Sequence, residues 1–211
     1  MDIGNIRQDY QLKTLSESDI AANPFAQFDI WWDEAVKSEI EEVNAMTLAT
    51  ATPDGIPSAR IVLLKDFDAR GFTFFTNYES LKGKELLENP NAALVFFWKE
   101  LQRQVRIQGK VEKVAPGESD LYYNSRPYGS RIGAWSSPQS RPIASRSLLE
   151  ENVAKFSAQY KADVPRPSFW GGYRLVPDLF EYWQGRSSRL HDRFQYRLTA
   201  DNRWEVIRLA P

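Results

Sequence analysis

Alternation of apolar and polar residues predicts strands over much of the chain. The patterns cover residues 45–51, 60–65, 72–77, 92–98, 102–114, 172–176, 179–183, 194–198 and 204–209. Within 102–114, Val105 and Ile107 alternate with Arg106 and Gln108, which indicates one buried and one solvated face. Because several connections have hairpin length, the pattern favours an antiparallel barrel with helices packed outside it.

Helical spacing is confined to shorter segments. Asn23 can cap a helix that Pro24 opens, and apolar residues then recur every three or four positions as far as Glu41. Further helices are predicted over residues 80–88, 118–124 and 147–160.

Two polar segments stand apart from this pattern. Residues 125–146, rich in Ser, Arg, Pro and Gly, are expected to form a loop, and loops of this length in compact domains are usually functional or disordered. Residues 1–20 are weakly patterned and are interpreted as a flexible N-terminal arm, which leaves 21–211 as a single domain.

Composition excludes several classes of function. The 211 residues carry a net charge of -1, so no global positive field would attract nucleic acid or anionic lipid. The longest apolar run falls far short of the ~20 residues that cross a bilayer. The chain has no cysteine and one histidine, which suits a cytoplasmic location and makes a transition-metal site improbable. No glycine-rich phosphate loop follows any predicted strand.

A phosphate would therefore have to be held by side-chain cations. Arg60 and Lys65 bracket an apolar strand, Arg126 lies in the polar loop, and Arg189 and Arg193 flank the only histidine. Arginine with nearby hydroxyls is a common way to bind a phosphate dianion. The alternative, that these are solvated surface charges, is weakened because the loops also carry tryptophans. If residues 189–193 are extended, both arginines and the histidine share one face.

At these positions the chain resembles the pyridoxamine 5'-phosphate oxidase family, from Ile6 to Pro211. The matching stretches are 60–65 (RIVLLK), 75–77 (FTN), 103–105 (RQV), 125–127 (SRP), 132–135 (IGAW), 139–140 (QS), 167–172 (PSFWGG), 183–185 (WQG), 189–193 (RLHDR) and 208–211 (RLAP). So many matches in the same order make the resemblance specific.

The resemblance implies a mainly β fold, an antiparallel FMN-binding split β-barrel with flanking α-helices, assembled as a homodimer. It implies FMN contacts at Arg60, Ile61, Val62, Leu63, Leu64, Lys65, Phe75, Thr76, Lys82, Gln104, Gln139, Ser140, Trp183 and Arg193. It implies substrate contacts at Arg7, Tyr10, Lys65, Tyr122, Arg126, Ser130, Arg189 and His191, of which Arg189 and His191 would be catalytic. One position departs from the family, which often has arginine where this chain has Leu81, so weaker or compensated FMN binding is expected.

The implied activity is oxidation of pyridoxamine 5'-phosphate or pyridoxine 5'-phosphate to pyridoxal 5'-phosphate, with O2 reduced to hydrogen peroxide. Two other interpretations stay open. A flavin-barrel enzyme of another activity, such as a flavin reductase or a haem-degrading relative, would have no use for the residues implied to bind substrate. A non-enzymatic carrier of FMN or pyridoxal phosphate would keep the phosphate contacts without turnover.

Overall fold

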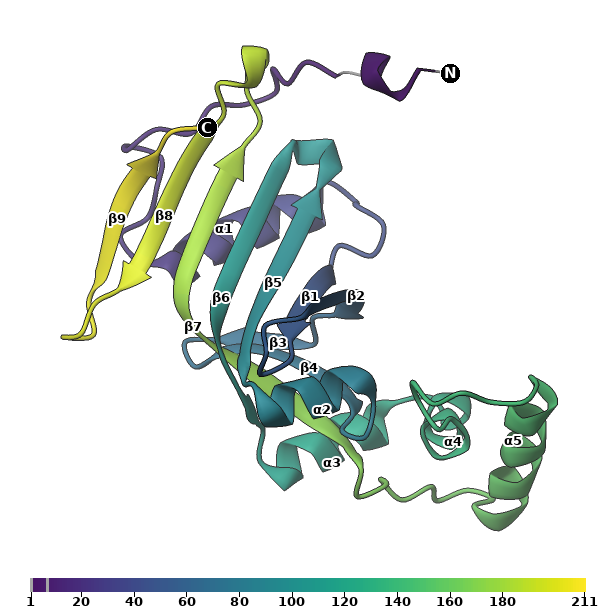
Figure 1. The fold of residues 1–211 in the computed structure, drawn as a ribbon. Coiled ribbons are helices and arrows are strands. Elements are labelled where there is room, and N and C mark those ends of the chain that lie inside the picture. The colour runs from purple at the N-terminus through teal and green to yellow at the C-terminus, as the bar shows by residue number, and fades with distance from the viewer. Residues whose placement is uncertain (1, 7) are drawn as a thin grey trace.

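The computed structural model describes residues 2–6 and 8–211 (Figure 1). Its helices are α1 (Pro24–Lys37), α2 (Leu81–Glu88), α3 (Pro116–Ser125), α4 (Tyr128–Ser136) and α5 (Ser147–Gln159), with short 3-10 turns η1 (Ile3–Asn5), η2 (Lys99–Leu101) and η3 (Ser187–Arg189). Its strands are β1 (Ala45–Ala51), β2 (Pro57–Leu63), β3 (Asp66–Asp68), β4 (Gly71–Asn77), β5 (Asn91–Trp98), β6 (Arg103–Lys113), β7 (Trp170–Gln184), β8 (Asp192–Leu198) and β9 (Trp204–Leu209).

All of these strands pair antiparallel in one curled sheet, which confirms the predicted mainly β architecture. The order is β2-β1-β5-β6-β7-β4-β3, and β8 and β9 extend from β7. One edge of β7 pairs with β6, while its other edge pairs first with β4 and then with β8. Strand β7 therefore runs the length of the sheet, from beside α3 to the turn η3 (Figure 1).

The core lies between α1 and one face of the sheet. The ring of Phe28 on α1 lies 4.8 Å from that of Phe72 and 5.3 Å from that of Phe96, and Trp31 packs on Tyr182. Full burial of one such side chain stabilises the fold by roughly 1.5–3 kcal/mol. The predicted cap is present, since Asn23 accepts from the backbone N–H of Phe25. The helix ends before the predicted Glu41 because Glu39 has φ 53°.

Two predicted strands, 172–176 and 179–183, are one strand in the structure. Pro177 interrupts the pattern, but it lies at a register shift opposite Gly109, where the sheet bends. Gly109 is required there, since a Cβ would lie 2.0 Å from the carbonyl oxygen of Val176. Strand β2 covers Pro57–Leu63 instead of the predicted 60–65, so Lys65 lies beyond its end.

Part of the segment predicted as a loop is helical. Helix α4 follows Pro127, and Trp135 on it packs against Phe156 of α5 with ring centroids 5.6 Å apart. The Trp135 indole N–H also donates to the Pro165 carbonyl at 2.8 Å. Tertiary packing thus stabilises a helix whose Ser, Arg and Gly content is typical of a loop. Helices α4 and α5 form a lobe to one side of the sheet (Figure 1).

The N-terminal arm packs along the last strands. Leu15 is buried and its N–H donates to Asp192 on β8, while Glu17 pairs with Arg208 on β9 at 2.7 Å. Whether residues 1–20 move as a flexible arm stays a prediction. In the part of the chain that the structure describes, no helix has the length and apolar character needed to span a bilayer.

Candidate functional site

A first cleft of about 320 Å³ gathers predicted site residues from distant parts of the sequence. It lies where β2, β4, α2, α3 and β7 meet, and it extends into an adjoining cleft of about 280 Å³ beside α4. The predicted residues that line the first cleft are Ile61, Val62, Leu63, Lys65, Phe75, Thr76, Lys82, Tyr122, Arg126 and Gln139. Ser130 lines the adjoining cleft, where Arg126 and Gln139 lie at the boundary between the two.

One side of the first cleft is a stack of aromatic rings. Phe75 and Tyr122 lie 4.0 Å apart at 24°, and Trp170 lies 5.6 Å from Phe75 at 13°. The Arg126 guanidinium lies 4.6 Å from the centre of the Trp170 ring. Flat apolar surface with a cation fixed beside it suits an aromatic ligand that carries an anionic group.

Two cations of this cleft, Lys82 and Arg126, are partly desolvated. Burial, and then repulsion from Arg60, lowers the pKa of Lys82, whose ammonium lies 3.4 Å from the Thr76 hydroxyl. Burial also lowers the pKa of Arg126, and its Nη1 has no hydrogen-bond partner among the described residues although it is buried. A buried, unsatisfied N–H costs about 1–3 kcal/mol, so an anion bound here would relieve a cost already present.

Arg60 is not among the described residues that line this cleft, and it is held by an internal anion. Its guanidinium donates to Ser58 at 2.6 Å and to the buried Glu85 carboxylate of α2 at 3.3 Å. Burial raises the pKa of Glu85, but hydrogen bonds from Thr50, Ser58 and Arg60 more than offset this and hold it below its usual value. Arg60 is close enough to repel the Lys82 ammonium, but part of its charge is already neutralised by Glu85.

Three further predicted residues form a row across neighbouring strands. Gln104 on β6 is paired with Trp183 on β7, which is paired with Arg193 on β8. The Arg193 guanidinium donates to the buried Glu181 carboxylate at 2.9 Å and to the Ala210 carbonyl at 2.7 Å. The row is thus fixed by backbone register and by contacts with β7 and the C-terminal residues.

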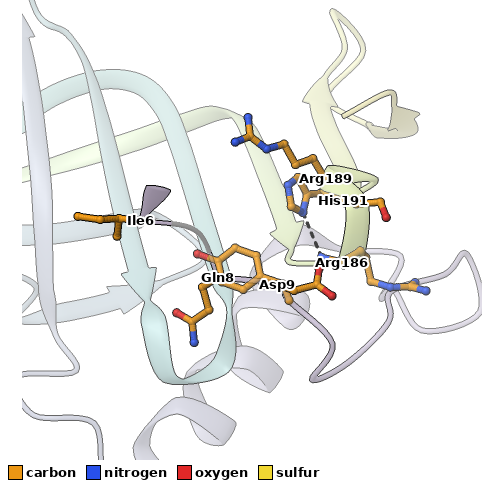
Figure 2. Close-up of a pocket in the computed structure, with 8 residues that line it drawn as sticks. Ile6, Gln8, Asp9, Arg186, Arg189 and His191 are labelled. Carbon is orange, nitrogen blue, oxygen red and sulfur yellow. Dashed lines mark hydrogen bonds between the residues drawn. The ribbon is translucent and has the colours of Figure 1, made fainter. Parts of the chain in front are cut away.

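A second cleft of about 490 Å³ lies beside this row and contains the predicted catalytic pair (Figure 2). The loop after β7 supplies Arg186, Arg189 and His191, and the N-terminal arm covers them with Asp9 and Tyr10. The His191 ring lies 4.5 Å from Trp183 and 6.1 Å from Tyr10. Burial, and then repulsion from Arg189, lowers the pKa of His191, which favours the neutral ring.

Residues 189–193 are not extended, which corrects the geometry considered from the sequence. Arg189 closes η3, and Ser188 and Arg189 both have left-handed φ values, 55° and 61°. Such conformations cost on the order of 1–3 kcal/mol each and are concentrated at functional sites. The turn brings Arg189 and His191 to one cleft, and Arg193 lies apart on β8.

The two clefts lie at opposite ends of β7. Trp170, at the start of this strand, lines the first cleft, and Trp183, near its end, contacts His191 of the second. At about 3.3 Å per residue, the strand between these tryptophans is roughly 40 Å long, measured along its path. In one copy of the chain, Arg126 and His191 therefore line separate clefts.

The remaining predictions fall outside these contacts. Arg7 lies outside the described residues. Leu64 is buried in the core, and Ser140, with φ 68°, lies just after Gln139. Sequence reasoning did not select Trp170, Asn77 or Glu85 as site residues; the PSFWGG stretch was the available signal for Trp170. Among the described residues, no three His, Asp or Glu side chains gather as metal ligands would.

Comparison with known proteins identifies the family. Residues 32–160 match the family model described as pyridoxamine 5'-phosphate oxidase, and residues 170–211 match the pyridoxine 5'-phosphate oxidase C-terminal dimerisation region. The chain is 59% identical over 210 residues to the pyridoxine/pyridoxamine 5'-phosphate oxidase of Trichormus variabilis, covering 99% of this chain and 98% of that protein. It is 57% identical over 209 residues to that of Cupriavidus pinatubonensis, covering 99% of each chain.

The chain belongs to the pyridoxamine 5'-phosphate oxidase family. The family model alone covers more than half of the chain, and the relatives span nearly all of it, so the predicted resemblance is confirmed.

Solved structures of related proteins share the fold. PhzG from Burkholderia lata, in complex with tetrahydrophenazine-1-carboxylic acid, superposes with a TM-score of 0.89 at 31% identity, covering 95% of this chain and 99% of that one. A pyridoxamine 5'-phosphate oxidase-related, FMN binding protein from Nostoc punctiforme superposes with a TM-score of 0.71 at 15% identity, covering 91% of this chain and 100% of that one. The second likeness concerns the fold alone.

Proposed function

We propose that the protein is a cytoplasmic, FMN-dependent oxidase that converts pyridoxamine 5'-phosphate and pyridoxine 5'-phosphate to pyridoxal 5'-phosphate and reduces O2 to hydrogen peroxide. The observation that carries the proposal is the first cleft, where the buried Nη1 of Arg126, which has no hydrogen-bond partner among residues 2–6 and 8–211, lies among cations and stacked rings. The relatives named above support the same substrates.

The residues present fit two phosphorylated aromatic groups. Lys82, with Thr76 and Arg60 nearby, would hold the FMN phosphate. The backbone of residues 61–65 would line the cofactor. Gln139, Ser140, Gln104, Trp183 and Arg193 would complete the FMN site. Lys65, Tyr122, Arg126 and Ser130 would hold the substrate phosphate, since they lie along the first cleft and its extension.

Two copies would be needed for a complete site. Arg189 and His191 would contact the reacting end of the substrate, but they lie at the far end of β7 from the phosphate-binding residues of their own chain. A symmetric dimer repeats every contact and can therefore juxtapose the first cleft of one copy with the second cleft of the other. The match of residues 170–211 to a dimerisation region supports this arrangement.

The protein's part in the reaction would be placement. When bound, FMN supplies a hydride acceptor that O2 reoxidises with release of hydrogen peroxide. Arg126, Lys65 and the Tyr122 and Ser130 hydroxyls would fix the phosphate, so that the 4' carbon has few alternative poses. Arg189 and His191 would orient the amine or alcohol, and Tyr10 on the arm would limit access of water to that end of the substrate.

The related PhzG structure suggests a rival substrate, because the molecule bound to it is a tricyclic carboxylic acid without phosphate. Anaerobic bleaching of the purified flavoprotein, followed near the visible absorption of oxidised flavin, separates the possibilities. We expect fast bleaching by pyridoxamine 5'-phosphate and pyridoxine 5'-phosphate, and far slower bleaching by unphosphorylated pyridoxamine at equal concentration. Faster bleaching by tetrahydrophenazine-1-carboxylic acid, or none by either phosphate ester, would contradict the proposal.

A further inference from the structure

The hydrogen bond to His191 determines which of its ring nitrogens carries the proton. The backbone N–H of Arg186 donates to His191 Nδ1 at 3.0 Å (Figure 2). A ring nitrogen that accepts a hydrogen bond has a free lone pair, so in the neutral ring the proton must be on Nε2. Burial and Arg189 together lower the pKa of His191 although Asp192 opposes them, so the neutral ring is favoured.

Arg186, whose backbone N–H fixes this tautomer, is held through its guanidinium by a carboxylate outside the predicted site. Asp192, the residue after His191, accepts from Arg186 Nη1 at 2.7 Å and from Arg208 Nη1 at 3.0 Å. It also accepts from the backbone N–H of Leu15 at 3.0 Å. One carboxylate therefore ties the Arg186 loop to β9 and to the N-terminal arm, and it holds both ends of the Arg186 to His191 segment.

We propose that Asp192 is a positioning residue which, through Arg186, fixes His191 with its proton on Nε2, so that His191 is a hydrogen-bond donor to the ligand and not a proton acceptor. The donor role rests on the proposed function; the tautomer does not. Asp9, Tyr10, Arg186 and Arg189 line the same cleft, and none of them bonds to the His191 ring except through the Arg186 backbone.

The Nε2–H tautomer limits what His191 can do in the reaction. Protonation of His191 would add a proton at Nδ1 and break the bond from Arg186, but Nε2–H would remain in both states. The donor is therefore available on both sides of the histidine pKa. A proton leaving the substrate amine or hydroxyl must go to solvent or to another group, because the one free lone pair of the neutral ring faces the Arg186 N–H.

Nuclear magnetic resonance of the 15N-labelled protein tests the tautomer directly, and the chain has only one histidine, so no assignment is needed. We expect a pyridine-type Nδ1 and a pyrrole-type Nε2 in the wild type, and averaged signals from both tautomers in Asp192→Asn. Asp201→Asn is the matched control, since Asp201 pairs with Arg203 in the exposed β8–β9 turn, and it should leave the spectrum unchanged. A pyrrole-type Nδ1 in the wild type, or a wild-type spectrum in Asp192→Asn, overturns the proposal.

The donor role is tested by the rate of anaerobic flavin reduction across pH. His191→Gln keeps an N–H donor near the Nε2 position and should stay within roughly tenfold of the wild type, whereas His191→Leu should lose on the order of 10²-fold. The acid limb of the wild-type profile should persist in His191→Gln. Equal losses in both variants, with a wild-type rate that falls as His191 protonates, overturn the donor role. Absence of bleaching by both phosphorylated substrates contradicts the proposed function, whereas the NMR spectrum decides the tautomer alone.

Discussion

At the scale of single residues, the cations of the first cleft differ in what already satisfies them. Arg60 is paired with Glu85, and Lys82 lies by the Thr76 hydroxyl, whereas Arg126 has a buried N–H with no hydrogen-bond partner among the described residues. A ligand anion gains most where a cation lacks an acceptor, because the desolvation cost has already been met by folding. Arg126 should therefore contribute strongly to binding of one phosphate.

Replacement of Arg126 shows whether it binds the substrate phosphate or the FMN phosphate. We expect Arg126→Ala to raise KM for pyridoxamine 5'-phosphate by roughly ten- to a hundredfold, the value of a lost charge-assisted bond, with FMN content unchanged. Steady-state kinetics and the flavin-to-protein absorbance ratio measure both quantities. Arg146→Ala, which removes an exposed arginine from the same connecting region, is the control and should alter neither. Loss of FMN with an unchanged KM would mean that Arg126 binds the cofactor phosphate.

Position 81 provides a test of the cofactor phosphate. Leu81 is the first residue of α2, next to Lys82, and its side chain is exposed. Because Glu85 already neutralises part of Arg60, an added cation here should strengthen FMN binding; we expect Leu81→Arg to lower the dissociation constant about tenfold. Quenching of FMN fluorescence by the apoprotein measures it. Leu87→Arg adds the same charge to another exposed position of α2, and an equal effect there would indicate general attraction and not a contact at position 81.

At the scale of elements, the spacing of apolar residues predicted the helices and strands whose packing is regular. The alternation in 102–114 and the helical spacing after Pro24 correspond to β6 and α1, because one face of each is buried in the core. It could not predict α4, which is stabilised by Trp135 packing on distant residues, nor the continuity of β7 through Pro177. The resemblance named candidate site residues by segment, but their division between two clefts depends on the length of β7, which the sequence pattern split in two.

The contact between Tyr10 on the arm and Gly185 just after β7 can be tested by substitution. A Cβ at Gly185 would lie 2.7 Å from the Tyr10 ring, so Gly185→Ala should displace the arm from the second cleft. We expect faster tryptic cleavage after Lys13 and a higher KM, with little change in the melting temperature. Gly117→Ala is the matched control, because a Cβ there meets nothing within 4 Å. Cleavage at the wild-type rate in Gly185→Ala would show that the arm does not depend on this contact.

At the scale of the whole molecule, the geometry of β7 determines how a site can be completed. The first cleft and the second cleft of one chain are separated by most of this strand. Apolar side chains such as Ile61 and Phe97 are exposed on strands near the first cleft and the Gln104 row, as expected of surface that another copy covers.

A mixed dimer tests whether two copies share each site. Arg126→Ala damages the first cleft and Arg189→Ala the second, so each homodimer should reduce its flavin slowly. If a site combines the first cleft of one copy with the second cleft of its partner, the heterodimer contains one site with both defects and one site with neither, and its activity should recover to about half that of the wild type.

Co-expression with two different tags allows purification of the heterodimer, and light scattering establishes its mass. A heterodimer of two differently tagged Arg126→Ala chains is the control and should not recover. If the mixed heterodimer is as slow as its parents, both clefts act on one ligand within a single chain, or Arg189 belongs to no site with Arg126, and the shared-site model is wrong.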